Sequence, residues 1–299
     1  MSTRRTGQVV VGVDGSDSAL EATRWGAAVA VRDRVPLRLT HAYDLPLGLP
    51  SGVTDDESLL HALREQGRRW LAEAREVAAE VDPDLPVDTE LEAVRTVPAL
   101  LHESQTASMV VLGTRGLSAF TGLLVGCTSV AVAGQAHCPV VIVRGLTTDQ
   151  PPRNTGPVVV GVDGTAVSEA AIAFAFAEAS ARRAELVAVH TWTESMFELA
   201  LAGNNLPIDL MVLKQQAEET LAERLAGWQE KYPDVRVQRD VVHDRPGRAL
   251  RRCSSTAQLV VVGRRGRGSF TSLLLGSTSH DLLYHARCPI AVVRAASGV

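Results

Sequence analysis

The sequence predicts an α/β fold in which a parallel sheet carries helices on both faces, and it predicts this fold twice in one chain. The seven residues Val-Val-Val-Gly-Val-Asp-Gly at 9–15 recur at 158–164. Matching residues are 149 apart at the start of the two copies, and 150 apart from Gly113 and Gly263 onward. This register continues as far as Cys138 and Cys288. Within each copy, short apolar runs alternate with longer segments of helical pattern, as in parallel sheets. The chain of 299 residues is therefore a tandem duplication of a whole domain.

Five strands are expected in each copy, because five short runs are rich in valine, isoleucine and leucine. Continuous apolar runs of this kind are typical of strands buried on both faces. In the first copy they are Gln8–Val13, Leu37–Tyr43, Val87–Ala93, Met109–Gly113 and Pro139–Arg144. In the second copy they lie near 157–162, 186–192, 235–242, 258–263 and 289–294.

Helices are expected between these strands. In the first copy, Ser16 or Asp17 caps a helix that runs to about Arg34. A long helix covers about Glu57–Val81, a short one covers Val97–Gln105 and starts at Pro98, and a fourth precedes the last strand. We expect the first domain at 1–147, a linker at 148–156 marked by prolines, and the second domain at 157–299.

Composition excludes several classes of protein. Hydrophobic residues make up 45% of the chain and charged residues 21%, which excludes a largely disordered chain. A net charge of −4 does not favour nucleic acid as a partner. We expect no membrane insertion, because no apolar run reaches the length of a membrane helix. We also expect a cytoplasmic location, since no signal-peptide core follows Met1 and the four cysteines form no CxxC pair.

A glycine-rich segment follows the fourth strand of each copy. The first copy reads Gly113-Thr-Arg-Gly116, nine residues, then Gly126-Cys127-Thr128; the second reads Gly263-Arg-Arg-Gly266, nine residues, then Gly276-Ser277-Thr278. Glycines let backbone N–H groups approach an anion, and the helix that follows offers its N-terminus. The pattern indicates a phosphate cradle; the alternative is a turn that only closes the fold. It is neither a P-loop nor a dinucleotide fingerprint.

This pattern, with an aspartate after the first strand and a Cys-Pro-Val segment at the last, resembles the universal stress protein family, and the length resembles its tandem-domain actinobacterial members. The resemblance covers about 8–145 and 157–295. It implies two Rossmann-like domains of the adenine nucleotide alpha hydrolase type, each a five-stranded parallel sheet of order 3-2-1-4-5 with four helices. It also implies that ATP binds, because members with this glycine pattern bind ATP, and we expect Mg²⁺ to accompany the nucleotide.

The resemblance also implies a set of site residues. Asp14 and Asp163 meet the nucleotide, with Gly12 and Gly161 before them, and the backbones of Ala42 and Thr191 meet the adenine. Ribose and phosphates are held by Gly113, Arg115, Gly116, Gly126, Cys127 and Thr128 in the first copy and by Gly263, Arg265, Gly266, Gly276, Ser277 and Thr278 in the second.

Some of these positions have alternative interpretations. The two aspartates are turn residues in one interpretation and help to hold Mg²⁺ in another. Cys127 stands where the family has serine or threonine, and a thiol is the weaker donor, so we expect the second site to bind more securely. A redox role for Cys127 is a further alternative. His41 and His190 are interpreted as structural histidines.

We therefore expect an ATP-binding regulatory protein of a stress or dormancy response, with one adenine-nucleotide site per domain and no catalytic residues. The alternatives are a slow ATPase or an adenine-nucleotide hydrolase or transferase, and a scaffold with vestigial sites. The family resemblance implies a homodimer. We also expect a regulatory protein partner, which the sequence does not identify.

Overall fold

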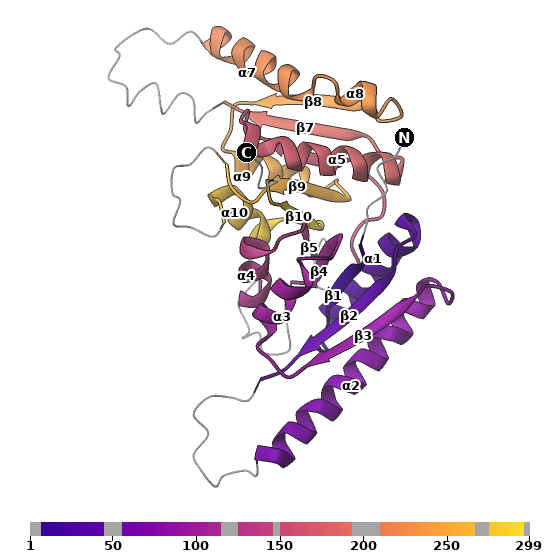
Figure 1. Ribbon diagram of the computed structural model, residues 1–299. Coiled ribbons are helices and arrows are strands. Elements are labelled where there is room, and N and C mark those ends of the chain that lie inside the picture. Colours follow the sequence, from indigo (N-terminus) through magenta and orange to yellow (C-terminus); the bar gives the residue numbers. More distant parts are fainter. Residues whose placement is uncertain are drawn as a thin grey trace. The chain divides into compact units, whose positions relative to one another are not determined.

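The computed structural model describes residues 7–44, 56–114, 125–145, 150–192, 210–266 and 275–295 (Figure 1). The chain folds as two compact units that divide between Arg144 and Gly145. Two tandem domains were predicted, and this is confirmed; the exact limits of the linker stay a prediction.

The first unit contains a parallel sheet of strands β1 (Val9–Gly12), β2 (Leu37–Ala42), β3 (Val87–Glu92), β4 (Met109–Gly113) and β5 (Val140–Val143). Within this unit the strand order is β3-β2-β1-β4-β5, with every neighbouring pair parallel. The predicted order is confirmed. The central strands are almost entirely buried, which explains their unbroken valine and isoleucine runs.

In the described residues of this unit, four helices cover the sheet: α1 (Asp17–Asp33), α2 (Asp56–Val81), α3 (Thr96–Glu103) and α4 (Cys127–Gln135). A Cβ built on Gly26 of α1 would touch Val11, and one built on Gly12 would touch Leu100 of α3. Because neighbouring residues of a strand point to opposite faces, α1 and α3 lie on opposite faces of the sheet. Helix α3 begins two residues before Pro98, so the expected start at that proline was slightly wrong.

The second unit repeats the plan with strands β6 (Val158–Val162), β7 (Leu186–Thr191), β8 (Val237–Val242), β9 (Leu259–Gly263) and β10 (Ile290–Val293). Their order is β8-β7-β6-β9-β10, again with parallel neighbours. The helices are α5 (Glu169–Arg182), which follows a 3-10 turn η1 (Ala166–Ser168), then α7 (Leu210–Leu225), α8 (Trp228–Lys231), α9 (Pro246–Cys253) and α10 (Ser277–His285).

The described residues of the second unit contain more than the expected four helices, because its long helix is divided. Gly227, with φ of 77°, separates α7 from α8 in a left-handed conformation, whereas α2 of the first unit continues through Val77. Glycine adopts this conformation without the steric cost that other residues bear. Each of the duplicated domains therefore has a sheet of the same plan, and the two domains differ in the helices beside their outer strands.

Candidate functional site

The carboxyl ends of β1, β2 and β4 are neighbours, since β1 lies between the other two strands. Strand order reverses beside β1, and ligands of such sheets bind in the crevice at that point. Asp14 follows β1, Ala42 ends β2 and Gly113 ends β4. In the second unit Asp163, Thr191 and Gly263 occupy the same places on β6, β7 and β9. The fold thus brings the predicted residues to one edge of each sheet.

Each aspartate forms the turn that begins the first helix. Asp14 Oδ1 accepts hydrogen bonds from the Ser16 backbone N–H at 3.1 Å and from Ser16 Oγ at 2.6 Å. Asp163 Oδ1 accepts the equivalent bonds from the Thr165 N–H at 2.9 Å and from Thr165 Oγ1 at 2.8 Å. The turn interpretation is therefore confirmed for one carboxylate oxygen. The other oxygen of Asp163 faces the backbone of Gly266, because an ideal Cβ on that glycine would lie 3.3 Å from Oδ2.

Ser16 and Thr165 are residues that the sequence analysis did not place in the site. Ser16 caps α1, and its Oγ accepts from the Ala19 N–H at 3.2 Å. Thr165 Oγ1 accepts from the Val167 N–H at 3.2 Å. Their hydroxyl groups bond both to the aspartate and to the first turn of the helix. The sequence feature that could have predicted this role is a serine or threonine two positions after each aspartate.

The buried histidines form hydrogen bonds to the backbone at the same end of each sheet. His41 Nδ1 lies 2.7 Å from the Val13 carbonyl oxygen, and His190 Nδ1 lies 2.7 Å from that of Val162. A carbonyl only accepts, so Nδ1 donates in both bonds. Burial lowers the pKa of His41 below its ordinary value. The structural interpretation of both histidines is confirmed.

Gly12 and Gly161 have a packing role that sequence reasoning missed. An ideal Cβ on Gly12 would lie 2.5 Å from Leu112 Cδ2, and one on Gly161 would lie 2.8 Å from Leu250 Cδ1. Leucine side chains therefore fill the space that a side chain would need. At the end of β4, Gly113 permits the first turn of α1 to approach, since its Cβ would lie 2.6 Å from the Ser18 carbonyl oxygen.

The two ends of the glycine-rich segment meet in the second unit. An ideal Cβ on Gly276 would lie 3.4 Å from Arg265 Cα and 3.6 Å from the Gly266 nitrogen. The Gly276 N–H donates to the Arg264 carbonyl at 2.9 Å. Together with Asp163, which lies beside Gly266, we call these closely spaced residues the second cradle.

The first unit has the equivalent closure at the residues that the structure describes there. The Gly126 N–H donates to the Thr114 carbonyl at 2.7 Å. Arg115 and Gly116 lie outside the described residues, so the predicted roles of these two residues stay predictions.

A buried serine ties each following helix to the strand end. Ser129 Oγ donates to the Gly113 carbonyl at 2.9 Å, and Ser279 Oγ donates to the Gly263 carbonyl at 2.7 Å. Both serines are almost fully buried. They hold the N-termini of α4 and α10 at the cradle, and sequence reasoning missed them although they share one position in the repeat.

The N-termini of α4 and α10 are suited to an anion. Gly126 and Gly276 are their N-cap residues, and no cap side chain accepts a hydrogen bond from the first turn of either helix. Glycine has no side chain with which to cap, so the first N–H groups are left for another acceptor, and the helix dipole favours negative charge there. Cys127 and Ser277 are exposed at these ends; Thr128 and Thr278 are half-buried.

Positive charge gathers beside the second cradle. Burial and the like charges of Arg294 and Arg265 lower the pKa of Arg264. A threonine, Thr114, occupies the position of Arg264 in the first unit. The second unit therefore carries an additional cation close to its glycine-rich segment.

The predicted adenine contacts lie farther along the edge. The Ala42 carbonyl accepts from Thr96 Oγ1 at 3.3 Å. Thr191 is half-buried and precedes Trp192, which stacks on His243 with ring centroids 4.1 Å apart. The structure places both residues on the strand next to the aspartate.

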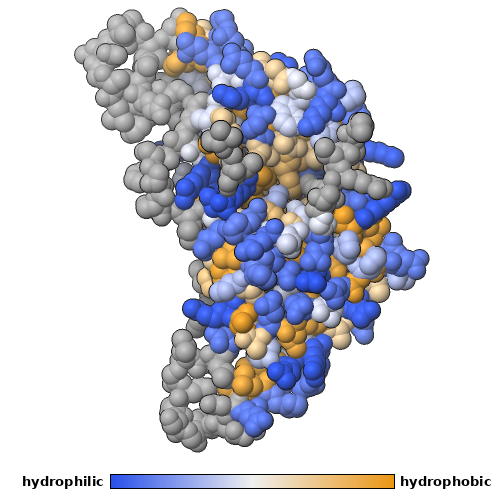
Figure 2. All heavy atoms as spheres, in the orientation of Figure 1, coloured by the Kyte–Doolittle hydropathy of each residue, from blue (hydrophilic) through white to orange (hydrophobic). Residues whose placement is uncertain are grey.

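The described residues contain no group of three or more histidine, cysteine, aspartate or glutamate side chains that could hold a metal ion. No helix in this part of the chain combines the length and the apolar character that crossing a membrane requires. Figure 2 shows a described surface on which hydrophilic and hydrophobic residues are interspersed.

Comparison with known proteins gives a consistent result. The model of the universal stress protein family matches residues 6–144 and 154–294. Universal stress protein Rv2005c of Mycobacterium tuberculosis is 42% identical over 294 residues, which cover 97% of this chain and 98% of that protein. Rv2623 of the same organism is 39% identical over 296 residues, with 96% of each chain covered. A universal stress protein structure from Archaeoglobus fulgidus shares the fold, with a TM-score of 0.69, 18% identity and 98% of each chain covered.

Proposed function

The chain belongs to the universal stress protein family, and from that premise we propose that it is an ATP-binding regulatory protein of a stress or dormancy response, with one adenine-nucleotide site in each domain. The observation that supports this most directly is the second cradle. There the backbone of Gly266 and Gly276, the N-terminus of α10 and the Asp163 carboxylate meet at one end of a parallel sheet.

The residues present fit a phosphate group. An ideal Cβ on Gly276 would make only ordinary van der Waals contacts, the nearest at 3.4 Å with Arg265 Cα, so the backbone there is not sterically closed. The N–H groups of the first turn of α10 and the hydroxyls of Ser277 and Thr278 are donors, and Arg265 supplies charge. In the first domain Gly126, Cys127 and Thr128 take these places, with Arg115 as the cation.

Magnesium belongs to this proposal as a partner of the nucleotide. Mg²⁺ is held in many nucleotide sites by one or two carboxylates together with the phosphates. Asp14 and Asp163 each commit Oδ1 to the turn, and Oδ2 is the oxygen that would face the ion. Bound ATP would bias the protein between two conformations by binding one of them more tightly.

The proposal includes a cytoplasmic location, a homodimer and an unidentified regulatory protein partner. The four cysteines, which all lie in the described residues, form no disulfide. This supports a reducing compartment.

Isothermal titration of nucleotide-free protein with Mg-ATP tests the proposal. About two sites per chain are expected in the wild type and about one in each of the variants Gly126→Ala and Gly276→Ala. Neither substitution should disturb the fold, because the added Cβ would make only ordinary contacts. It would lie 3.7 Å from the Thr114 carbonyl oxygen in Gly126→Ala and 3.4 Å from Arg265 Cα in Gly276→Ala. Circular dichroism should therefore remain unchanged while the methyl group obstructs the phosphate.

Two outcomes would contradict the proposal. One is the absence of binding at high micromolar ATP; the other is an unchanged stoichiometry in both alanine variants. The Cys127→Ser variant should tighten the first site, because a hydroxyl donates more strongly than a thiol. Single-turnover hydrolysis that Asp163→Ala abolishes while binding persists would favour the ATPase alternative.

A further inference from the structure

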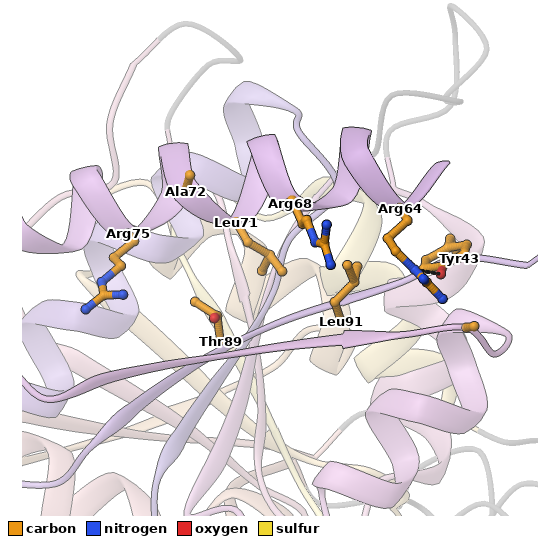
Figure 3. A pocket seen from close by; sticks show the side chains of 9 residues that line it. Tyr43, Arg64, Arg68, Leu71, Ala72, Arg75, Thr89 and Leu91 are labelled. Atoms are coloured by element: carbon orange, nitrogen blue, oxygen red, sulfur yellow. Dashed lines mark hydrogen bonds between the residues drawn. The ribbon is translucent and has the colours of Figure 1, made fainter. Parts of the chain in front are cut away.

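The first domain contains a groove that the nucleotide proposal does not use. It lies between α2 and β3 and has a volume of about 490 Å³ (Figure 3). Its lining residues come from both elements and from the end of β2: Tyr43, Arg64, Arg68, Leu71, Ala72, Arg75, Thr89, Leu91 and Ala93. Since β3 is the outermost strand at this end of the order, the groove is two strands away from Asp14.

Three guanidinium groups make the groove cationic. Arg64, Arg68 and Arg75 project from α2 toward β3 (Figure 3). All three are exposed, and their spacings of four and seven residues place them along one face of the helix. Arg64 Nε donates to the Tyr43 hydroxyl at 3.3 Å, and Arg68 pairs with Glu65 at 2.7 Å. The positive charge therefore extends along about three helical turns.

The floor of the groove is apolar and its wall is an edge strand. Leu71 projects from α2 and Leu91 projects from β3 into the space between the two elements (Figure 3). In the described residues β3 pairs with β2 alone, so its other side presents backbone N–H and C=O groups, of which the Thr89 N–H donates to Asp88 Oδ1 at 3.0 Å. The acidic residues Asp88, Glu90 and Glu92 alternate with the lining residues and so project from the opposite face, where Asp88 pairs with Arg38.

The second domain lacks this combination. At the position of Ala93 it has His243, whose ring stacks on Trp192 at 4.1 Å. At the position of Arg68 it has Glu218, a change from a cation to an anion. Lys214, at the position of Arg64, keeps a cation there. At the position of Arg75 the second domain has Leu225, which is buried, and Arg239 stands in place of Thr89. The fold does not need the groove, because the other copy folds with different residues in the same places.

We propose that this groove binds an acidic, extended peptide segment of a partner protein, which adds a strand to β3 beneath the arginines of α2. The backbone of β3 would supply hydrogen bonds, and the arginines would select carboxylates at alternate positions. The geometry matches, since four helical residues rise about 6 Å and two strand residues about 6.6 Å. Arg64 and Arg68 would therefore meet acidic side chains two residues apart. This inference stands independently of nucleotide binding.

Fluorescence anisotropy with a labelled short peptide of alternating glutamate and valine tests the proposal on the full chain. The double variant Arg68→Glu with Arg75→Glu should weaken binding by about tenfold or more, because two attractive charges become repulsive. Arg69→Glu is the matched control: Arg69 is exposed on the same helix and does not line the groove. This control should change the affinity by less than about twofold. Ala93→His, which copies the second domain, should also weaken binding.

Hydrogen exchange provides a second measurement that a merely electrostatic contact would not satisfy. Bound peptide should slow exchange in the segment Val87–Glu92, because an added strand protects backbone amides. The proposal is overturned if the peptide does not bind, if Arg69→Glu weakens binding as much as the double variant, or if β3 gains no protection. It is also overturned if a single-stranded oligodeoxythymidine binds the wild type as tightly as the acidic peptide does.

Discussion

The substitution Gly15→Ala should destabilise the first domain by about 2–5 kcal/mol. Gly15 directly follows the site aspartate and has φ of 79°, a conformation that costs an ordinary residue about 1–2 kcal/mol. An added Cβ would also lie 2.2 Å from Trp70 Nε1, so the indole must move, and overpacking of this kind costs about 1–3 kcal/mol. Trp70 stands edge-on to His41 at 5.1 Å, so the displacement would reach the histidine that braces β1.

Urea unfolding of the full chain, with hydrogen exchange to assign the transition to the first domain, measures this cost. Gly227→Ala is the control: that glycine has φ of 77°, and its Cβ would meet nothing within 4 Å. The free energy of unfolding of Gly227→Ala should therefore fall only by the cost of the left-handed backbone conformation, about 1–2 kcal/mol.

A double-mutant cycle isolates the contact with the indole. Combining Gly15→Ala with Trp70→Ala should recover about 1–3 kcal/mol relative to the sum of the single changes, because the second substitution removes the clash. Strict additivity would refute the steric argument, as would a loss in Gly15→Ala no larger than that in Gly227→Ala.

Three further predictions concern groups whose surroundings are equally defined. Burial lowers the pKa of His41, so the unfolded chain binds a proton at this residue more readily than the folded chain does. The urea concentration at the unfolding midpoint should therefore fall as the pH drops below about 6.5. A His41→Gln variant that kept this pH dependence would contradict the assignment. Burial raises the pKa of Cys138 to about 12, whereas Cys127 is exposed. Iodoacetamide at neutral pH should therefore modify Cys127 before Cys138. Equal rates of modification of these two cysteines in the folded protein would contradict this order. Arg182→Ala should cost about 3 kcal/mol in urea unfolding, because it removes the ion pair, at 2.8 Å, from the fully buried Glu178. A cost below about 1 kcal/mol would contradict this reasoning.

The sheet could be predicted from sequence because its signal is local. Val9–Gly12 and Met109–Gly113 are continuous apolar runs, and burial on both faces demands that composition. The position of the glycine-rich segment after the fourth strand, together with the aspartate after the first, also identified the edge of the sheet where the structure brings these residues together. Both signals follow from short stretches of sequence and from the rule that parallel strands end at the same edge.

Other features depend on contacts between distant segments and carried no local signal. Gly12 looked like a ligand residue, but its missing Cβ is needed by Leu112, which is 100 residues farther along the chain. Ser129 looked like an ordinary helix residue, yet its hydroxyl reaches the Gly113 carbonyl. The break at Gly227 required a conformation that a helical pattern does not reveal.

The internal repeat makes one more inference possible, since each copy serves as a reference for the other. Residues that close the cradle are the same in both copies: Asp14 and Asp163 form the same turn, and Ser129 and Ser279 make the same bond. Residues of the α2–β3 groove differ in charge and in size between the copies. If the groove were only a consequence of helix packing, its arginines would need no particular arrangement, yet three of them lie along one face of α2. The two domains thus keep the same turn and the same buried hydrogen bond at the cradles but differ where a partner is proposed to dock, so a partner of the groove would recognise the first domain and not the second.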